Sequence, residues 1–184
     1  DLLDTPTIVT MVDQVAQALD YVHEQQILHL DLKPENILID PKAEGKLPRF
    51  VLTDFGIARF TRPDGQLSNL AGTPRYMSPE QFEFEHGRID HRVDIYALGI
   101  ILYELIVGHA PFRARMLYEL ARQHLHELPV PPSLLVPSLS PQIESVILTA
   151  LAKKPEDRFA SAGALSQALK ATNHVADERA NLID

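Results

Sequence analysis

The sequence of 184 residues contains no cysteine. Disulfide bonds, thiolate metal sites and cysteine nucleophiles are therefore excluded. The absence fits a reducing compartment, and we expect a cytoplasmic location. No basic segment followed by an apolar one opens the chain, so we expect no signal peptide. The longest apolar run, residues 95–102, is too short to span a bilayer, and a membrane tether would need a segment outside this chain.

The sequence also lacks a surplus of positive charge, since its formal net charge is −8. The acidity is uneven: residues 1–40 carry −7, residues 41–92 carry +1 and residues 93–184 carry −2. Non-specific nucleic-acid binding depends on a basic surface, so we expect no nucleic-acid partner. An anionic ligand would fit best at the middle segment, the only one that is not acidic.

What is present is typical of a globular chain, with 45% hydrophobic and 23% charged residues. Apolar residues at helical spacing predict a first helix, capped by Thr5 and running to about residue 26. Short apolar runs at 37–39 and 50–52 predict a β-hairpin. Residues 55–80 show no sustained period, which predicts a long loop of the kind that is usually functional.

The second half of the chain predicts a helical domain. Residues 93–107 are apolar almost all round and predict a buried central helix. Five prolines in residues 129–141 predict a connecting loop. Ser140 and Ser161 are expected to cap two further helices, and a polar, frayed tail is expected from Asn173.

A polar loop between two apolar runs carries Asp31, Lys33 and Asn36. Asp54 ends the second strand of the predicted hairpin, so the four side chains are expected to lie together. Carboxylate and amide oxygens with one ammonium suit a divalent cation and a phosphate, and the other carboxylate can orient an attacking hydroxyl. The same residue types are also common in ordinary turns, so the constellation alone leaves both interpretations open.

Five motifs, in order, resemble the protein kinase family. HLDLKPEN at residues 29–36 is similar to its catalytic loop, and Asp54-Phe55-Gly56 to its metal-binding motif. GTPRYMSPE at 72–80 resembles the end of its activation segment, DIYALG at 94–99 the start of its central helix and KPEDRF at 154–159 its late arginine motif. Lys33, two residues after Asp31, is typical of the serine/threonine kinases within this family. The motif sequences are similar to those of its bacterial members.

The resemblance covers about residues 5–170 and implies a protein-kinase-like α+β fold. This chain would be the mainly α-helical C-lobe with a small β-hairpin, formed by residues 1–172 and followed by a polar tail at 173–184. The N-lobe, with its Gly-rich loop and strand lysine, is missing from the sequence. Such a fragment is expected to be nearly inactive alone and to expose the apolar surface that faces the N-lobe, which invites association.

The resemblance also implies roles for individual residues, with ATP and Mg²⁺ as cofactors and protein serine or threonine as substrate. Asp31 matches the catalytic base, and Lys33 the residue that contacts the γ-phosphate. Thr73 matches the threonine that supports the acceptor loop. Asn36 and Asp54 match the two protein ligands of Mg²⁺.

Other matched residues are expected to surround and support the site. Leu38 is expected to pack beneath the adenine, together with two residues of the central helix, Ile101 and Leu105. Asp94 is expected to bind the backbone of the catalytic loop.

Four further residues match the family's structural positions. Glu80 and Arg158 are expected to form a buried ion pair, whose loss would be far more costly than that of an exposed pair. His29 and Phe55 are expected to be core residues.

One position departs from the family pattern. Leu30 stands where most members have an arginine that pairs with a phosphorylated residue of the activation loop. Leucine cannot form that pair, and Arg59 remains as a partial substitute. We therefore expect activity to depend only weakly on phosphorylation at Thr61, Ser68 or Thr73.

Two other functions stay open. A small-molecule phosphotransferase, such as a relative of aminoglycoside kinases, carries a similar His-x-Asp-x4-Asn pattern, although Lys33 and the late arginine motif weigh against it. A non-catalytic kinase-like module would instead bind proteins around residues 112–125. His124 and His126 could suggest a metal pair, but no third ligand is evident, and a solvated loop is expected there.

Overall fold

The computed structural model describes residues 4–40, 48–55, 59–60, 72–83 and 89–180. The α-helices in these ranges are α1 (Thr5–Glu24), α2 (Pro79–Phe82), α3 (Arg92–Val107), α4 (Leu117–His126), α5 (Pro132–Leu135), α6 (Pro141–Ala150) and α7 (Ala162–Ala180). The strands are β1 (Ile27–Leu28), β2 (Ile37–Asp40), β3 (Arg49–Leu52) and β4 (Arg59–Phe60). Single 3-10 turns are η1 (Pro34–Asn36), η2 (Pro74–Tyr76) and η3 (Pro155–Asp157).

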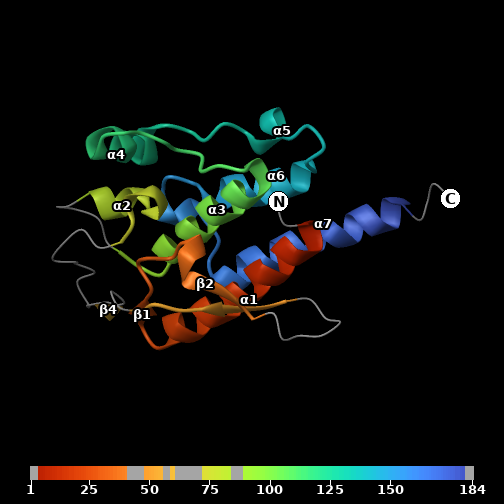
Figure 1. Cartoon of the computed structure of the whole chain (residues 1–184), viewed down its shortest axis with the longest axis horizontal. Helices are drawn as coiled ribbons and strands as arrows, with labels where there is room; N and C mark the ends of the chain where they lie inside the picture. The colour runs from red at the N-terminus through yellow and green to blue at the C-terminus, as the bar shows by residue number, and fades with distance from the viewer. Residues whose placement is uncertain (1–3, 41–47, 56–58, 61–71, 84–88, 181–184) are drawn as a thin grey trace.

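Helix α3 runs through the middle of the molecule (Figure 1). Every residue from Val93 to Tyr103 is buried, which confirms the predicted central helix. A helix with no polar face must be covered on all sides. Helices α1, α6 and α7 supply much of that cover, and α1 lies side by side with α7 along one flank.

The first helix begins where the sequence predicts, but its cap is different. Asp4, not Thr5, is the N-cap, and its carboxylate accepts a hydrogen bond of 2.9 Å from the backbone N–H of Thr7. Aspartate is as good a cap as threonine, and it stands one residue earlier. The buried face of α1 consists of Ile8, Met11, Val12, Val15, Ala16 and Leu19.

The predicted hairpin is confirmed as the antiparallel pair of β2 and β3, in which Ile37 faces Leu52. Gln14 of α1 ties the hairpin to the helical body. Its side-chain oxygen accepts a 2.7 Å hydrogen bond from the backbone N–H of Phe50, and its amide donates to the carbonyl of Pro48 at 3.4 Å. The start of β3 is thereby tied to α1.

Three elements differ from the sequence expectation. Strand β4 pairs with β1 inside the segment expected to be a loop, and helix α5 forms within the proline-rich connection. Helix α7 continues to Ala180, past the position 173 where the polar tail was expected to begin. Among the described residues, none of the helices has both the length and the apolar character needed to cross a bilayer.

The two predicted serine caps are present. Ser140 accepts from the backbone N–H of Ile143 at 3.2 Å, and Ser161 accepts from that of Ala164 at 3.0 Å. The start of α7 has a further hydrogen-bond acceptor that the sequence does not predict. The carboxylate of Asp20, in α1, accepts from the two N–H groups that precede Ala164, so it fixes α7 to α1.

Candidate active site

Asp94, in the first turn of α3, holds the loop between β1 and η1 by accepting hydrogen bonds from its backbone. Its Oδ2 accepts a 2.9 Å hydrogen bond from the backbone N–H of His29, and its Oδ1 accepts one of 2.9 Å from that of Leu30. The Nε2 atom of His23 lies 2.7 Å from the same Oδ2. Asp94 is 1% exposed, so these contacts offset the cost of burying its charge. The predicted contact of Asp94 with the loop backbone is confirmed. The contact of His23 with the same carboxylate was not predicted.

Leu30 has a left-handed backbone conformation, with φ of 67°. Such a conformation is strained for a residue with a side chain and persists only where its surroundings hold it. Here the Asp94 carboxylate fixes the N–H of Leu30, and its side chain is buried in a small apolar cluster with Leu28, Ile89 and Val93. The position that the family usually gives to arginine is therefore occupied by apolar packing.

Three side chains of the site form a closed hydrogen-bonded set. Lys33 Nζ donates to Asp31 Oδ2 at 2.6 Å, and Thr73 Oγ1 donates to Asp31 Oδ1 at 2.6 Å. Lys33 Nζ also lies 3.2 Å from Thr73 Oγ1. Thr73 precedes η2, so the end of the segment expected to be an activation loop folds back onto the polar loop. The three residues predicted to act together are brought together.

The contacts of this set determine its protonation. Burial on its own would raise the pKa of the Asp31 carboxyl, but the hydrogen bonds from Lys33 and Thr73 and the charge of Lys33 outweigh it and lower that pKa. The hydrogen bond to Asp31 raises the pKa of Lys33. At neutral pH the site therefore contains a carboxylate that accepts hydrogen bonds and an ammonium that donates them.

The hairpin register brings Asp54 beside Asn36. Asn36 Nδ2 donates to the backbone oxygen of Asp31 at 2.9 Å, and the backbone N–H of Thr53 donates to the backbone oxygen of Asn36 at 2.9 Å. Asp54 follows Thr53 directly, is exposed and has φ of 63°, a conformation that aspartate tolerates better than most residues. Within the described ranges, neither the amide oxygen of Asn36 nor the carboxylate of Asp54 has a hydrogen-bond partner.

These two groups fit a hard cation. Both offer oxygen, the ligand type that Mg²⁺ prefers, and Mg²⁺ commonly takes the rest of its shell from phosphates and water. No set of three or more His, Cys, Asp or Glu residues in the described part of the chain could hold a metal by itself. A cation bound by Asn36 and Asp54 would therefore take the rest of its ligands from phosphates or water.

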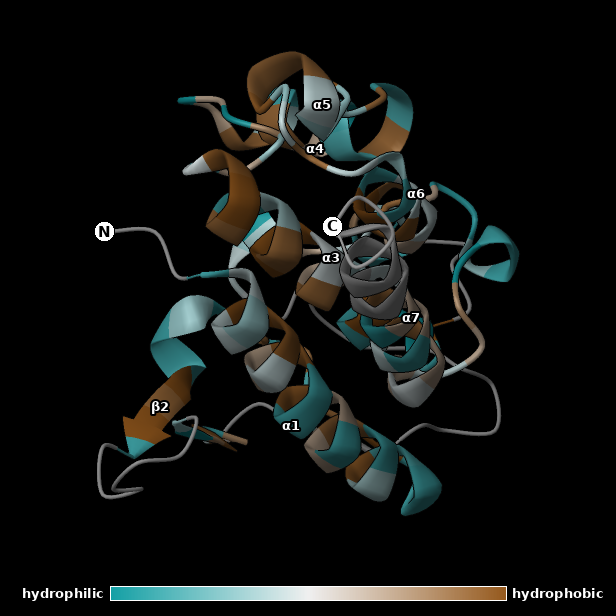
Figure 2. Cartoon of the chain, turned by 90° about the vertical axis from the view of Figure 1, so that its right-hand side faces the viewer, coloured by the Kyte–Doolittle hydropathy of each residue, from teal (hydrophilic) through white to brown (hydrophobic). Residues whose placement is uncertain are grey.

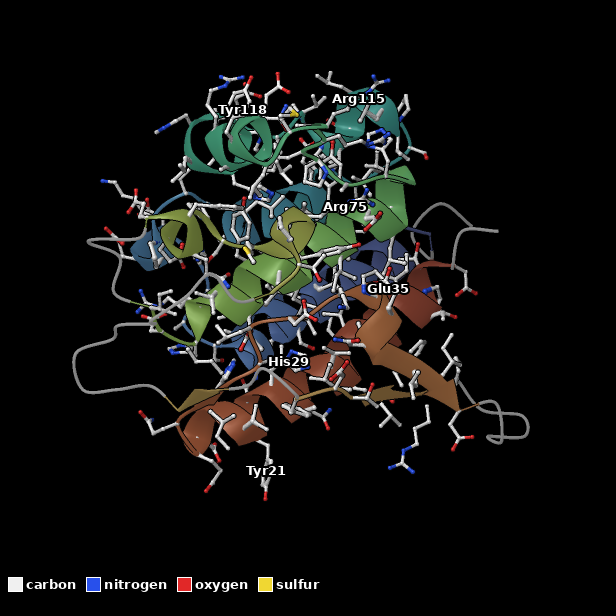
Figure 3. The ribbon with its side chains drawn as sticks, turned by 60° about the vertical axis from the view of Figure 1, so that its left-hand side comes forward. Tyr21, His29, Glu35, Arg75, Arg115 and Tyr118 are labelled. Atoms are coloured by element: carbon white, nitrogen blue, oxygen red, sulfur yellow. The ribbon has the colours of Figure 1, made fainter. Side chains whose placement is uncertain are left out.

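The apolar and aromatic residues expected around the site differ in how far they are buried. His29, which is labelled in Figure 3, is fully buried. Its Nε2 lies 3.1 Å from the backbone oxygen of Thr53, and its ring centroid is 4.7 Å from that of Phe55. Phe55 is 38% exposed, so the expectation of a core residue is correct for His29 and only partly so for Phe55. Leu38 is 53% exposed on β2, whereas Ile101 is buried in α3.

The predicted ion pair of Glu80 and Arg158 is confirmed. Arg158 Nη1 and Nη2 donate to Glu80 Oε1 and Oε2 at 2.6 and 2.8 Å, and both side chains are buried. The guanidinium also donates to the backbone oxygens of Ala152 and Lys153. Glu80 lies in α2 and Arg158 in the chain that follows α6, so this bidentate ion pair joins the two segments.

His124 is not in a solvated loop, so that prediction is wrong. It lies in α4 with no exposed surface, and its Nδ1 is 3.0 Å from the hydroxyl of Tyr96. Burial and the charge of Lys153 lower the pKa of His124 to about 3. The amphipathic pattern of α4 turns this residue inward, whereas His126 remains exposed.

Some of the sequence predictions concern residues outside the described ranges. These are Gly56, Thr61 and Ser68, together with the side chain of Arg59.

The chain is similar to known proteins along most of its length. Residues 2–172 match the protein kinase domain family. The chain is 43% identical over 180 residues to the serine/threonine-protein kinase pkn3 of Myxococcus xanthus, covering 93% of this chain and 32% of that protein. It is 42% identical to Pkn1 of the same organism, over 89% of this chain and 24% of the relative. It is 40% identical to PknH of Mycobacterium bovis, over 90% of this chain and 27% of the relative.

The chain thus spans about a third or less of the length of these curated relatives. The helical body with its small hairpin and the motif residues gathered around Asp31 are those of a protein-kinase-like fold. Since the family match extends over nearly the whole sequence, this chain belongs to the protein kinase family.

Proposed function

We propose that the protein carrying this chain is a serine/threonine protein kinase, which transfers the γ-phosphoryl group of ATP to a serine or threonine hydroxyl of a protein. The observation that carries the proposal is the hydrogen-bonded set of Asp31, Lys33 and Thr73. Beside it lie the side-chain oxygens of Asn36 and Asp54, which have no hydrogen-bond partner among the described residues and could bind a cation. Phosphoryl transfer needs positioning and charge stabilisation more than covalent chemistry from the protein, and this set can supply both.

Each side chain has a distinct task in this proposal. The Asp31 carboxylate accepts the hydrogen bond of the substrate hydroxyl, orients it and takes its proton as the new P–O bond forms and the bond from the γ-phosphorus to the leaving ADP breaks. The Lys33 ammonium, already beside Asp31, stabilises negative charge on the transferred group. Thr73 holds the Asp31 carboxylate in place through its hydrogen bond and would support the acceptor hydroxyl beside it.

Asn36 and Asp54 would hold Mg²⁺, which neutralises charge on the ATP phosphates when bound. The fit rests on their two oxygen donors and on their closeness through the backbone of Thr53. Leu38 would contact the adenine from below, since its apolar side chain is exposed on β2, on the same hairpin.

We also propose that this chain corresponds to the C-lobe of the kinase domain. The apolar side chains of Leu38 and Ile39 are 53% and 54% exposed, and Figure 2 shows β2 as a hydrophobic strand at the edge of the molecule. Exposed apolar surface of this kind marks an interaction site. Packing of an N-lobe at this edge of the molecule would cover Ile39 and, together with the adenine, Leu38, and the 184-residue chain alone would associate through these exposed side chains.

The test is a phosphorylation assay with purified full-length protein, radiolabelled ATP and Mg²⁺. We expect label on a generic protein such as casein and none on an aminoglycoside. The 184-residue chain, assayed in parallel, is expected to be nearly inactive. Transfer to the aminoglycoside in place of the protein would contradict the proposal and favour a small-molecule phosphotransferase.

Nucleotide binding separates catalysis from the remaining alternative, a non-catalytic protein-binding module. A module of that kind needs no ATP, so Mg²⁺-dependent binding of ATP to the full-length protein, weakened by Asp54→Asn, supports the kinase proposal. Absence of any ATP binding would support the module instead.

A further inference from the structure

Arg75 lies at the edge of the catalytic set without belonging to it. It stands two residues after Thr73, within η2, and η2 packs against α3 and α4, so its backbone position is set by the core. Its side chain is 54% exposed. Figure 3 shows Arg75 and Glu35 in the middle of the molecule, whereas Arg115 lies at its upper end.

Arg75 shares this place with two carboxylates. Its Nη1 is 3.8 Å from Glu104 Oε1, while the hydroxyl of Tyr76 donates to Glu104 Oε2 at 2.8 Å. Burial and the bond to Glu104 raise the pKa of Tyr76, the charges of Glu104 and Glu35 add to the rise, and the charge of Arg75 opposes it. The charges of Glu35, Glu104 and Arg75 therefore all act on the Tyr76 hydroxyl.

The pairing within this group is incomplete. Glu35 is exposed and has no hydrogen bond or ion pair to any described residue. The contact of Arg75 with Glu104 is long and open to solvent, and exposed pairs of this kind contribute little. Arg75 can therefore give its donors to another carboxylate at small cost, and a guanidinium binds a carboxylate through two parallel hydrogen bonds.

We propose that Arg75 determines the charge preference for protein substrates. Its guanidinium partly neutralises Glu104 and presents free donors to an acidic residue near the phosphorylated serine or threonine. Without it, Glu35 and Glu104 would face the substrate as two carboxylates and favour basic residues. Arg75 is thus a specificity-determining residue, and the inference rests on the proposed kinase function.

The test compares peptides with one central threonine. One set carries a single aspartate at each position from three before to three after the threonine, a second set carries arginine there, and a third is neutral. The kcat/KM of each peptide is normalised to the neutral peptide for full-length wild type, Arg75→Ala and Arg75→Glu. Arg115→Glu is the matched control, because it makes the same charge change at an exposed residue away from Glu35 and Glu104.

We expect wild type to prefer aspartate at one or two positions. Arg75→Ala should lower the aspartate-to-arginine ratio there about 5-fold, and Arg75→Glu should lower it at least about 10-fold and reverse the preference. The change should be mainly in KM. An unchanged ratio in both variants, or an equal change in Arg115→Glu, overturns the inference while the kinase function stands. Wild type that phosphorylates no peptide or protein instead overturns the proposed function.

Discussion

The backbone carbonyl of Leu30 faces Gly72 so closely that no β-carbon would fit between them. Gly72 also has φ of 113°, a conformation that side chains rarely adopt. Thr73 follows directly and donates to Asp31. The contact between Gly72 and the Leu30 carbonyl therefore sets how near Thr73 comes to the loop that carries Asp31.

Replacing that glycine is expected to separate the two segments. Gly72→Ala should reduce kcat/KM for a protein substrate by about 10²-fold, since a misplacement of about 1 Å near a catalytic group has effects of that size. Gly108→Ala is the matched control, because Gly108 also has positive φ (86°) but open space around its Cβ position. It should cost only about 1–2 kcal/mol in stability and leave kcat/KM unchanged. Equal activity of both variants would show that the close approach is not needed.

The carboxylate of Asp31 provides a second prediction. Asp31→Asn keeps the shape of the side chain but removes its charge and its ability to take a proton. We expect kcat to fall by about 10²–10⁴-fold, while binding of MgATP, measured by calorimetry, changes little. Asp157→Asn, at an exposed aspartate of η3, should leave kcat unchanged. A loss below about tenfold in Asp31→Asn would remove Asp31 from the role of catalytic base.

The buried ion pair predicts a stability difference between two glutamates. Glu80→Gln leaves Arg158 as a buried charge without its counter-ion, and we expect the free energy of unfolding in urea to fall by about 3–5 kcal/mol. Glu127→Gln breaks an exposed pair with Arg122 and should cost about 0–1 kcal/mol. Similar losses in the two variants would mean that burial does not govern the strength of the Glu80 pair.

Local sequence patterns predict part of this structure well. The apolar run predicts α3, and the two short β-type runs predict the hairpin, because each pattern depends on neighbours in sequence. The ordered kinase-like motifs predict which polar side chains gather at Asp31. In these cases the information lies within a few residues or in a family pattern.

Contacts chosen by packing are not predicted. Asp20 caps α7 from a helix 142 residues earlier, and His23 contacts Asp94 across 71 residues. Gln14 holds the hairpin in the same way. No local pattern tells which polar residue of α1 will meet another element, because that depends on how the helix is rotated against the core.

Leu30 yields a prediction about regulation. Because its side chain is apolar and buried among apolar residues, Leu30 itself cannot bind a phosphate. We expect the double variant Thr61→Ala with Ser68→Ala to keep full-length activity within about threefold of wild type, measured with casein. Thr73 is excluded from this test since it contacts Asp31 directly. Loss of activity in the double variant would show that phosphorylation is required in spite of Leu30.

The buried His124 predicts how stability depends on pH. Burial and the charge of Lys153 lower its pKa to about 3 in the folded protein, whereas the ordinary value is 6.5. Between pH 6.5 and 3 the unfolded chain therefore binds the extra proton, and the free energy of unfolding must fall as the pH falls. Each pH unit below 6.5 costs about 1.4 kcal/mol, so His124 should remove about 2 kcal/mol between pH 7 and 5.

Urea unfolding at pH 7 and pH 5 tests this for His124→Gln and for His126→Gln, a change at an exposed position of the same helix. The first variant should lose about 2 kcal/mol less than wild type on acidification, because a glutamine binds no proton. The second should follow the wild-type profile. Because the comparison is between profiles, a lower stability of His124→Gln at pH 7 does not affect it. Parallel profiles for all three proteins would mean that His124 is protonated in the folded state near its ordinary pKa, and that the aromatic side chains around it do not exclude a charge.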